Sequence, residues 1–329
     1  MKPARLSSLF WVWALALSSA CAGCSSSGET AALDSGPPGG GGACPARTDE
    51  TIAVKIRMTV TWPGTAGYIP GTGSYVIWLL SRYAIDGQNN ITSTTRICQI
   101  GLPAITESPS DLATSRPVGD VKIWLASPVS EWKKVTKTTV ATGVLGGWAV
   151  GSSIAIHPSV SLFGLKDSSQ YKDAATPWPS ASSDPYPFGT APDYEDEEGD
   201  GTPGVTLLSL ADAGYAEIPT SLSPTAPVAD RVYAASRIEL SLYGTSKSCG
   251  EASGTANVSL IDNRFIGCHL EGDGGLCTPD QSDFVDATWQ VTYLPGPATF
   301  EQVVLPEGAS ATCYDVVAAL PDTDVMDGG

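Results

Sequence analysis

Histidine is scarce in this sequence, and the local motifs of common enzyme active sites are missing. The 329 residues include only two histidines, His157 and His269. There is no Gly-x-Ser-x-Gly nucleophile elbow, no His-Glu-x-x-His zinc motif and no Walker phosphate-binding loop. These absences argue against serine hydrolases, zinc proteases and Walker-type nucleotide hydrolases. A glycosidase-like hydrolase stays open, because two carboxylates without a local motif suffice for its chemistry.

Basic residues are also few. Lys and Arg total 18 against 35 Asp and Glu, and the formal net charge is −17. A surface with this excess of acid repels phosphate backbones and anionic lipid headgroups, so we expect no nucleic-acid partner. Any attachment to a membrane would therefore have to be covalent.

The N-terminal apolar stretch is too short to cross a bilayer, which takes about 20 residues. This stretch, Leu9–Leu17, follows the basic residues Lys2 and Arg5 and precedes small residues that end in Cys24. The arrangement resembles the signal peptide and lipobox of bacterial lipoproteins, in which a peptidase cuts before a cysteine that then carries the lipid. The resemblance implies that residues 1–23 are removed and that the protein meets the membrane through a lipid on Cys24.

Cys21 is the alternative site of lipid attachment. Cysteine parity favours Cys24, because its use leaves six cysteines, an even number that can pair in an oxidising compartment. An ordinary signal peptide cut near the same place is the other alternative. In the lipoprotein family, Ser25 rather than Asp after the lipid cysteine implies the outer membrane, with the protein facing the periplasm or the cell surface.

Composition divides the mature chain into three parts. Residues 24–43 are rich in Gly, Pro and Ser and have almost nothing to bury, so we expect a flexible tether. Residues 44–321 are expected to form a single β domain. The acidic residues 322–329 are expected to form a disordered tail.

Alternation of apolar and polar residues dominates the domain, and long helical periodicity is absent. Residues 51–62 alternate through six apolar positions, from Ile52 to Trp62, which predicts a half-buried strand. Related patterns predict further strands at 74–85, 91–97, 121–125, 132–142, 205–210, 237–243, 255–261, 287–294 and 300–305. The alternating segments 238–242 and 256–260 are expected to form a hairpin. A short helix fits near 204–213 or 316–320.

These strands predict an all-β fold stapled by disulfides. Because no parallel βαβ rhythm is present, two architectures stay open. One is an antiparallel barrel, up-and-down or calycin-like, and the other is a two-sheet sandwich. The barrel is slightly favoured.

The remaining cysteines are expected to form structural disulfides: Cys44, Cys98, Cys249, Cys268, Cys277 and Cys313. Cys268 and Cys277 flank a glycine-rich turn and are expected to close a local loop. Cys44 would then pair with Cys98, and Cys249 with Cys313, although other connectivities are open. A metal site is disfavoured, because no Cys-x-x-Cys remains after processing.

Residues 176–204 form an acidic loop that is rich in Pro and aromatic residues. Its candidate metal ligands are carboxylates at alternate positions and one backbone carbonyl, namely Asp196, Glu198, Asp200 and Thr202. With Gly201 next, the spacing resembles the opening of an EF-hand calcium loop, Asp-x-Asp-x-Asp-Gly. The twelfth position is Leu207 rather than the usual bidentate Glu, so the resemblance implies at most a shorter calcium loop. The alternative is a solvated acidic loop without a cation.

Four aromatic residues lie in the same loop: Trp178, Tyr186, Phe188 and Tyr194. They would suit a recognition surface for sugars or peptides. More often such residues fold back over an open barrel end or a sheet edge, and this is the favoured interpretation.

The lipobox, the tether, the acidic stretch at 200–206 and the cysteine-rich C-terminal third together resemble lipoproteins of myxobacteria to which no activity is assigned. The resemblance implies an exported, lipid-anchored envelope protein. We expect a non-catalytic binding module for a small apolar ligand or a partner protein. A secreted hydrolase and a structural envelope component are the alternatives. A large apolar cavity with few polar groups would favour binding, and two inward carboxylates in a cleft would favour hydrolysis.

Overall fold

The computed structural model describes most of the chain between residues 42 and 322. The described residues are 42–65, 67–107, 122–166, 169–179, 193–211, 214–223, 225–272 and 274–322. The chain separates into a unit of residues 1–40 and a unit from residue 41 onward, and the second unit contains the whole described fold. The expected signal peptide, Cys21, Cys24 and most of the tether lie outside the described residues.

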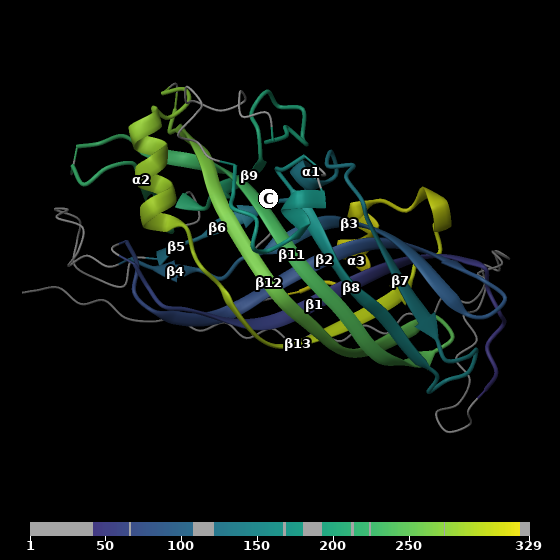
Figure 1. Ribbon diagram of the computed structural model, residues 1–329. Coiled ribbons are helices and arrows are strands. Elements are labelled where there is room, and N and C mark those ends of the chain that lie inside the picture. The colour runs from purple at the N-terminus through teal and green to yellow at the C-terminus, as the bar shows by residue number, and fades with distance from the viewer. Residues whose placement is uncertain are drawn as a thin grey trace, which may run out of the picture. The chain divides into compact units, whose positions relative to one another are not determined.

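Eight antiparallel strands pair edge to edge into a closed ring (Figure 1). In ring order they are β1 (Asp49–Trp62), β2 (Gly71–Ile85), β3 (Asn90–Gly101), β7 (Thr139–Leu145), β8 (Ser153–Phe163), β11 (Val228–Ser248), β12 (Glu251–Leu270) and β13 (Leu294–Val304). The ring closes because β13 pairs with β1. The all-β prediction is confirmed, with the up-and-down barrel as its form. The sandwich alternative is wrong, because one sheet closes on itself.

Shorter elements complete the described fold. The short strands are β4 (Ile105–Thr106), β5 (Lys122–Ile123), β6 (Leu125–Ser127), β9 (Val205–Ser209) and β10 (Ile218–Pro219). The helices are α1 (Val129–Trp132), α2 (Pro279–Trp289) and α3 (Cys313–Ala319), with 3₁₀ turns at Ser169–Lys172 and Gly308–Ser310. Within the described ranges, no helix has the length and apolar character needed to cross a membrane.

The two ends of the barrel are built differently. The staple end contains the start of β1 at Asp49 and the turn between β11 and β12 near Cys249, and there the eight long strands complete the ring. The helix end contains the end of β1 at Trp62. At this end β6 and β9 stand between β3 and β11, in place of β7 and β8. β12 also leaves β13 beyond Ala256, and α2 lies along this part of β12 (Figure 1).

Apolar side chains fill the barrel because its strands alternate between an inner and an outer face. The inward residues of β1 are each at most 1% exposed: Ile52, Val54, Ile56, Met58 and Val60. β2 is buried on both faces, because Tyr75 and Ile77 face the interior while Val76 and Trp78 pack beneath α3. This second layer explains why the sequence of β2 is apolar nearly throughout.

Three disulfides staple the barrel. They are Cys44–Cys249, Cys98–Cys313 and Cys268–Cys277, with Cα atoms 5.3, 5.0 and 5.3 Å apart. The predicted Cys268–Cys277 pair is confirmed, and the other two predicted pairings are wrong. Closure of the ring brings the start of the domain to the turn between β11 and β12, so Cys44 meets Cys249. Packing of α3 against β2 and β3 brings Cys313 to Cys98.

Two predicted strands are helical at least in part. Residues 287–294 overlap α2, which begins with a capping box between Thr278 and Gln281 and has Pro279 in its first turn. Residues 132–142 begin at the last residue of α1, and strand β7 starts only at Thr139. α3 confirms the short helix expected near 316–320, whereas β9 occupies the other position proposed for one.

β8 was not predicted. His157 and Pro158 interrupt the alternation that Ile154 and Ile156 begin, although both isoleucines point into the core. At the far end of the chain, Asp322 forms an ion pair with Arg57 and has a side chain only 1% exposed. The ordered fold therefore extends through Asp322, and residues 323–329 lie outside the described residues.

Candidate ligand-binding site

A cavity opens inside the helix end of the barrel. Its empty volume is about 690 Å³, including the space that is open to solvent at its mouth. Strands β2, β3, β6, β8, β9, β11 and β12 all contribute to its wall. The largest side chains of the lining are aromatic: Tyr75, Trp132, Phe163, Phe265, Trp289 and Tyr293. Such an apolar, concave lining is typical of sites for small molecules.

α2 and the segment after it cover this cavity. Trp289, the last residue of α2, is 1% exposed, and its indole N–H donates to the carbonyl oxygen of Pro219 at 3.2 Å. Asp286 forms an ion pair with Arg264 of β12 and accepts the backbone N–H of Phe265 at 2.9 Å. The cover is therefore fixed to β12 by directed polar contacts, and the Cys268–Cys277 disulfide precedes it in the chain.

Edge-to-face aromatic pairs shape the wall. The rings of Trp132 and Phe163 have centroids 5.2 Å apart at an interplanar angle of 78°. The rings of Tyr75 and Tyr293 have centroids 5.3 Å apart at an angle of 73°. Pairs of this kind add stability beyond the area that they bury, so these side chains form a firm surface.

Polar groups are sparse in the lining. The described residues that line the cavity include no Lys, Arg, His, Asp or Glu. Burial raises the pKa of both Tyr75 and Tyr293 above the usual phenol range, so both stay neutral hydroxyl groups at physiological pH. The site can therefore accept an apolar molecule and orient it by a few neutral hydrogen bonds, but it offers a charged ligand no counter-ion.

A second cavity lies at the staple end, and it is more polar. Its empty volume is about 550 Å³, including open space, and the Cys44–Cys249 disulfide borders it. Glu50 in its wall pairs with Arg47 at 2.8 Å, and burial raises the pKa of the Glu50 carboxyl. Glu251, the other carboxylate of the lining, is exposed. One carboxylate is thus already paired with a cation and the other is solvated, which is a poor arrangement for paired acid–base chemistry.

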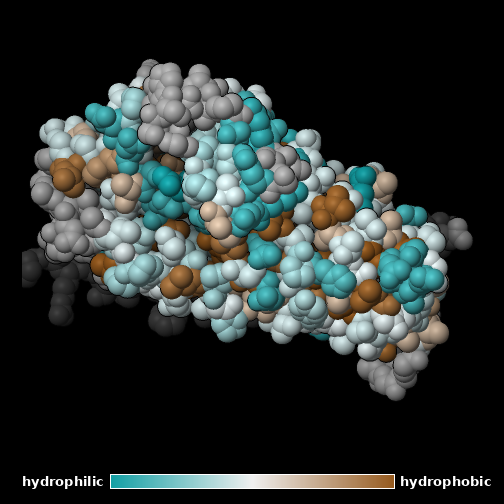
Figure 2. Space-filling model, in the orientation of Figure 1, coloured by the Kyte–Doolittle hydropathy of each residue, from teal (hydrophilic) through white to brown (hydrophobic). Residues whose placement is uncertain are grey.

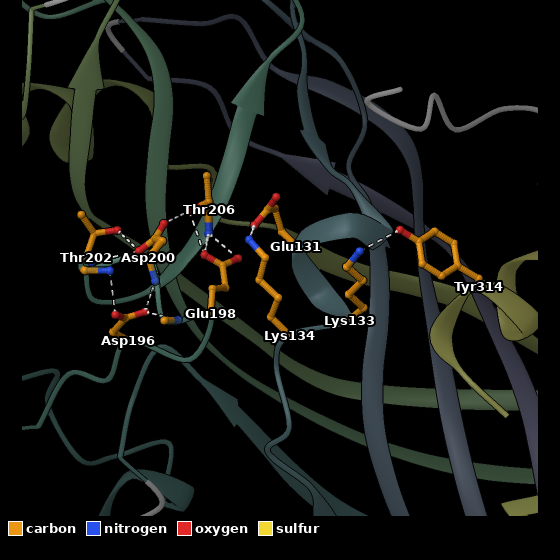
Figure 3. Close-up of polar contacts among 11 residues, drawn as sticks. Glu131, Lys133, Lys134, Asp196, Glu198, Asp200, Thr202, Thr206 and Tyr314 are labelled. Carbon is orange, nitrogen blue, oxygen red and sulfur yellow. Dashed lines mark hydrogen bonds and ion pairs between the residues drawn. The ribbon is translucent and has the colours of Figure 1, made fainter. Parts of the chain in front are cut away.

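The predicted metal ligands of the acidic loop turn to different partners (Figure 3). Asp196 accepts the backbone N–H groups of Gly199 at 2.7 Å and Gly201 at 2.9 Å. Asp200 accepts the backbone N–H of Thr202 at 2.9 Å. These contacts are those of a self-capped turn, in which side chains satisfy the N–H groups of their own loop.

Glu198 and Asp200 meet at Thr206 on β9. The hydroxyl of Thr206 lies 2.8 Å from Glu198 Oε2 and 3.1 Å from Asp200 Oδ2, and its backbone N–H donates to Glu198 at 3.0 Å. Burial raises the pKa of Glu198 to about 7. Within the described ranges, no three His, Cys, Asp or Glu side chains are grouped as metal ligands would be. The structure thus brings two of the three carboxylates together, and calcium binding stays a prediction.

Sequence reasoning missed Glu197, which points to the opposite side of the loop. Its Oε1 accepts Lys137 Nζ at 3.0 Å and the backbone N–H of Gly164 at 2.7 Å, and its buried Oε2 has no partner in the described part of the chain. Burial raises the pKa of this carboxyl to about 7. Glu197 lines a small cavity of about 240 Å³, which also contacts Trp132 and Phe163. It therefore stands behind the aromatic wall of the helix-end cavity.

The loop aromatics cover the outer face of the barrel rather than one of its ends. Trp178 and Tyr194 pack against a cluster that includes residues of β8, β11 and β12. The indole N–H of Trp178 donates to Asp262 at 3.0 Å, and the Arg237 guanidinium lies 5.0 Å from its ring centroid. These two residues do fold back onto the barrel, but they lie on its outer face and not over the open barrel end or sheet edge that was expected. Tyr186 and Phe188 lie outside the described residues.

The two histidines stand apart from both cavities. His157 is exposed and lies 3.2 Å from the Thr142 hydroxyl, and His269 lies 3.0 Å from the Asp230 carboxylate.

No protein-family model matches the chain, and no curated protein matches it in sequence.

Proposed function

We propose that this protein is a non-catalytic binding module that holds a small apolar molecule in the helix-end cavity of its barrel. The main support for this proposal is the cavity itself, which is apolar, lined by aromatic side chains and covered by α2. A covered apolar site removes a ligand from water, and this burial supplies the free energy of binding.

Export and a lipid anchor on Cys24 are part of the same proposal. The sequence features of residues 1–43 support it, as do the three disulfides of the described barrel, which suit an oxidising compartment. The proposal places the protein at the outer membrane. Expression of a Cys24→Ser variant in a bacterial host should release the protein from membranes. Release by a Cys21→Ser change instead would assign the lipid to Cys21.

The distribution of hydrophobic residues on the surface favours a small ligand over a protein partner. On the face seen in Figure 2, hydrophobic residues lie scattered in small groups among hydrophilic ones. The large exposed hydrophobic residues belong to different elements, such as Val140 on β7, Tyr243 on β11 and Leu294 on β13. Scattered single residues are ordinary for a soluble surface, whereas a docking face is usually one larger patch.

Filling the cavity tests the proposal. N-phenyl-1-naphthylamine, a neutral apolar dye that fluoresces when it leaves water, should bind the folded chain. Ala234→Leu adds volume to the helix-end cavity and should weaken dye binding at least tenfold. Ala252→Leu adds the same volume on the neighbouring strand, in the lining of the staple-end cavity, and should leave binding unchanged. Absence of dye binding, or equal loss in both variants, would contradict the proposed site.

A further inference from the structure

Two phenolic hydroxyls in the wall of the helix-end cavity have no hydrogen-bond partner in the part of the chain that the structure describes. Tyr75 on β2 is 1% exposed, and Tyr293, just before β13, is 6% exposed. Both line the cavity, and neither hydroxyl forms a hydrogen bond within the described residues. Neighbouring polar side chains do have hydrogen-bond partners. The Tyr68 hydroxyl donates to the Gln290 carbonyl oxygen at 2.8 Å, and the Trp289 indole N–H donates to the Pro219 carbonyl oxygen.

Unpaired hydroxyls at these positions need an explanation. Neither hydroxyl is among the fully enclosed polar atoms that lack a partner, so each oxygen borders the open space of the cavity, and Phe would fill nearly the same volume without placing a polar group there. The ring packing between Tyr75 and Tyr293 would be kept by two phenylalanines, so packing does not explain the oxygens. A hydroxyl that faces a cavity is explained if a molecule in that cavity pairs with it.

The surroundings decide which chemistry can pair with these groups. Among the described lining residues, tyrosine is the only ionisable type. A carboxylate or ammonium ligand would therefore find no counter-charge in the cavity. Burial keeps both phenols protonated, so each offers a hydrogen-bond donor. Flat aromatic surfaces from Trp132, Phe163 and Trp289 suit a ring-shaped body.

We propose that Tyr75 and Tyr293 bind the oxygen of an uncharged ring compound, with a ketone or a similar carbonyl group as the recognised feature. The inference rests on the proposed function, because it concerns the same cavity, and it adds the class of ligand. Oxygen recognition at two donors would let the site distinguish such a compound from a hydrocarbon of equal shape.

A matched pair of probes tests this inference. Acetophenone and ethylbenzene differ mainly in a carbonyl group, and isothermal titration calorimetry can measure the affinity of the full, disulfide-bonded chain for each. Tyr75→Phe and Tyr293→Phe should each weaken acetophenone binding about five- to tenfold, as expected for one lost hydrogen bond. Both should leave ethylbenzene binding within about twofold. Tyr83→Phe is the control, because its hydroxyl faces Gln302 at 3.4 Å near the staple end.

The outcomes separate the two proposals. Equal effects on both probes, or no effect on either, would overturn oxygen recognition while ethylbenzene binding still supported an apolar site. If the unmodified chain bound neither probe, both proposals would fall. The Phe variants should also keep or raise the melting temperature, because they remove unpaired hydroxyls. A fall of several degrees would show a structural role for the hydroxyls and would overturn the inference.

Discussion

The two ends of the barrel are closed by different means. At the staple end, a covalent bond between Cys44 and Cys249 joins the start of the domain to the β11–β12 turn, and nearby polar groups have partners. Trp148 there donates its indole N–H to Asn89 at 3.0 Å. At the helix end, the Cys268–Cys277 disulfide precedes α2, the cover itself is held by packing and polar contacts, and the hydroxyls of Tyr75 and Tyr293 have no partner within the described residues. The difference teaches that a long-range covalent bond closes the staple end directly, whereas the helix end leaves two hydroxyls in the wall of the cavity that we propose as the ligand site.

Disulfide removal should give the largest difference between the ends. Cys44 and Cys249 are 205 residues apart, and Cys268 and Cys277 are 9 apart. In the chain-entropy treatment, removing the first bond costs about 5 kcal/mol and removing the second about 3 kcal/mol. Denaturant unfolding of the double alanine variants, Cys44→Ala/Cys249→Ala and Cys268→Ala/Cys277→Ala, measures both. Dye binding in the helix-end cavity should survive in the Cys44→Ala/Cys249→Ala variant and weaken in the Cys268→Ala/Cys277→Ala variant. The opposite pattern would contradict the comparison between the two ends.

Truncation of one tryptophan at each end comes next. Trp289→Ala removes a fully buried indole from the cover of the cavity and should cost about 3–5 kcal/mol of unfolding free energy. Trp148→Ala removes a half-buried indole and should cost about 1–2 kcal/mol. Urea unfolding curves give both values. Equal costs would show that α2 contributes no more to closure than the staple-end loop does.

A pH prediction concerns the region behind the helix-end wall. The folded-state pKa of Glu197, about 7, lies above the ordinary value of 4.5, so the folded state binds its proton more tightly than the unfolded chain. The resulting stability is fully present below about pH 4.5 and is lost as pH rises to about 7. The loss is on the order of 2–3 kcal/mol, so the melting temperature should be higher at pH 5 than at pH 8.

The variant Glu197→Gln should reduce this pH dependence, because the amide cannot titrate, while Glu198 would keep its own contribution. Glu195→Gln is the matched control, since Glu195 contacts the same Lys137 amine at 2.8 Å but has a side chain 44% exposed. An unchanged slope in Glu197→Gln would assign the pH dependence to other carboxyl groups, of which Glu198, whose pKa burial also raises to about 7, is the first to test.

Calcium should give the smallest effect. If the acidic loop binds calcium with a dissociation constant near 0.1 mM, 1 mM calcium should stabilise the fold by about 1.4 kcal/mol. Magnesium should do less, because it prefers a small octahedral site with retained waters. Asp200→Ala should remove the gain. Identical melts in calcium and in chelator would leave only the self-capped turn that Asp196 and Asp200 form with backbone N–H groups.

The sequence predicted what depends on local pattern. Alternation of residues predicted β1, and the short spacing of Cys268 and Cys277 predicted their bond. The other two pairings failed because they depend on closure of the ring, which joins residues more than 200 positions apart. α2 was missed although its signal was present, since Thr278 and Gln281 form a capping box just before the apolar residues that were assigned to a strand.

The candidate site was less predictable than the fold. The cavity draws Tyr75, Phe163, Trp289 and Tyr293 from separate strands and from the segment after a helix, and no local pattern connects them. In the acidic loop, alternation drew attention to Asp196, Glu198 and Asp200. The residue between two of them, Glu197, has a buried oxygen that lacks a partner among the described residues. Burial of that kind depends on tertiary packing, which alternation in a loop does not reveal.

The Cys44–Cys249 bond also sets how the domain would respond to a mechanical pull. A force applied to the chain before Cys44 and resisted at the C-terminus passes through the disulfide directly to Cys249. The 205 residue positions between the two cysteines then form a closed loop, and the Cys98–Cys313 bond ties Cys98 within that loop to the C-terminal segment. Under oxidising conditions the two bonds together would limit the extension to the segment between Cys44 and Cys98, which contains β1 and β2, and to the residues after Cys313. After reduction of the bond, the same pull would peel β1 from its neighbours first.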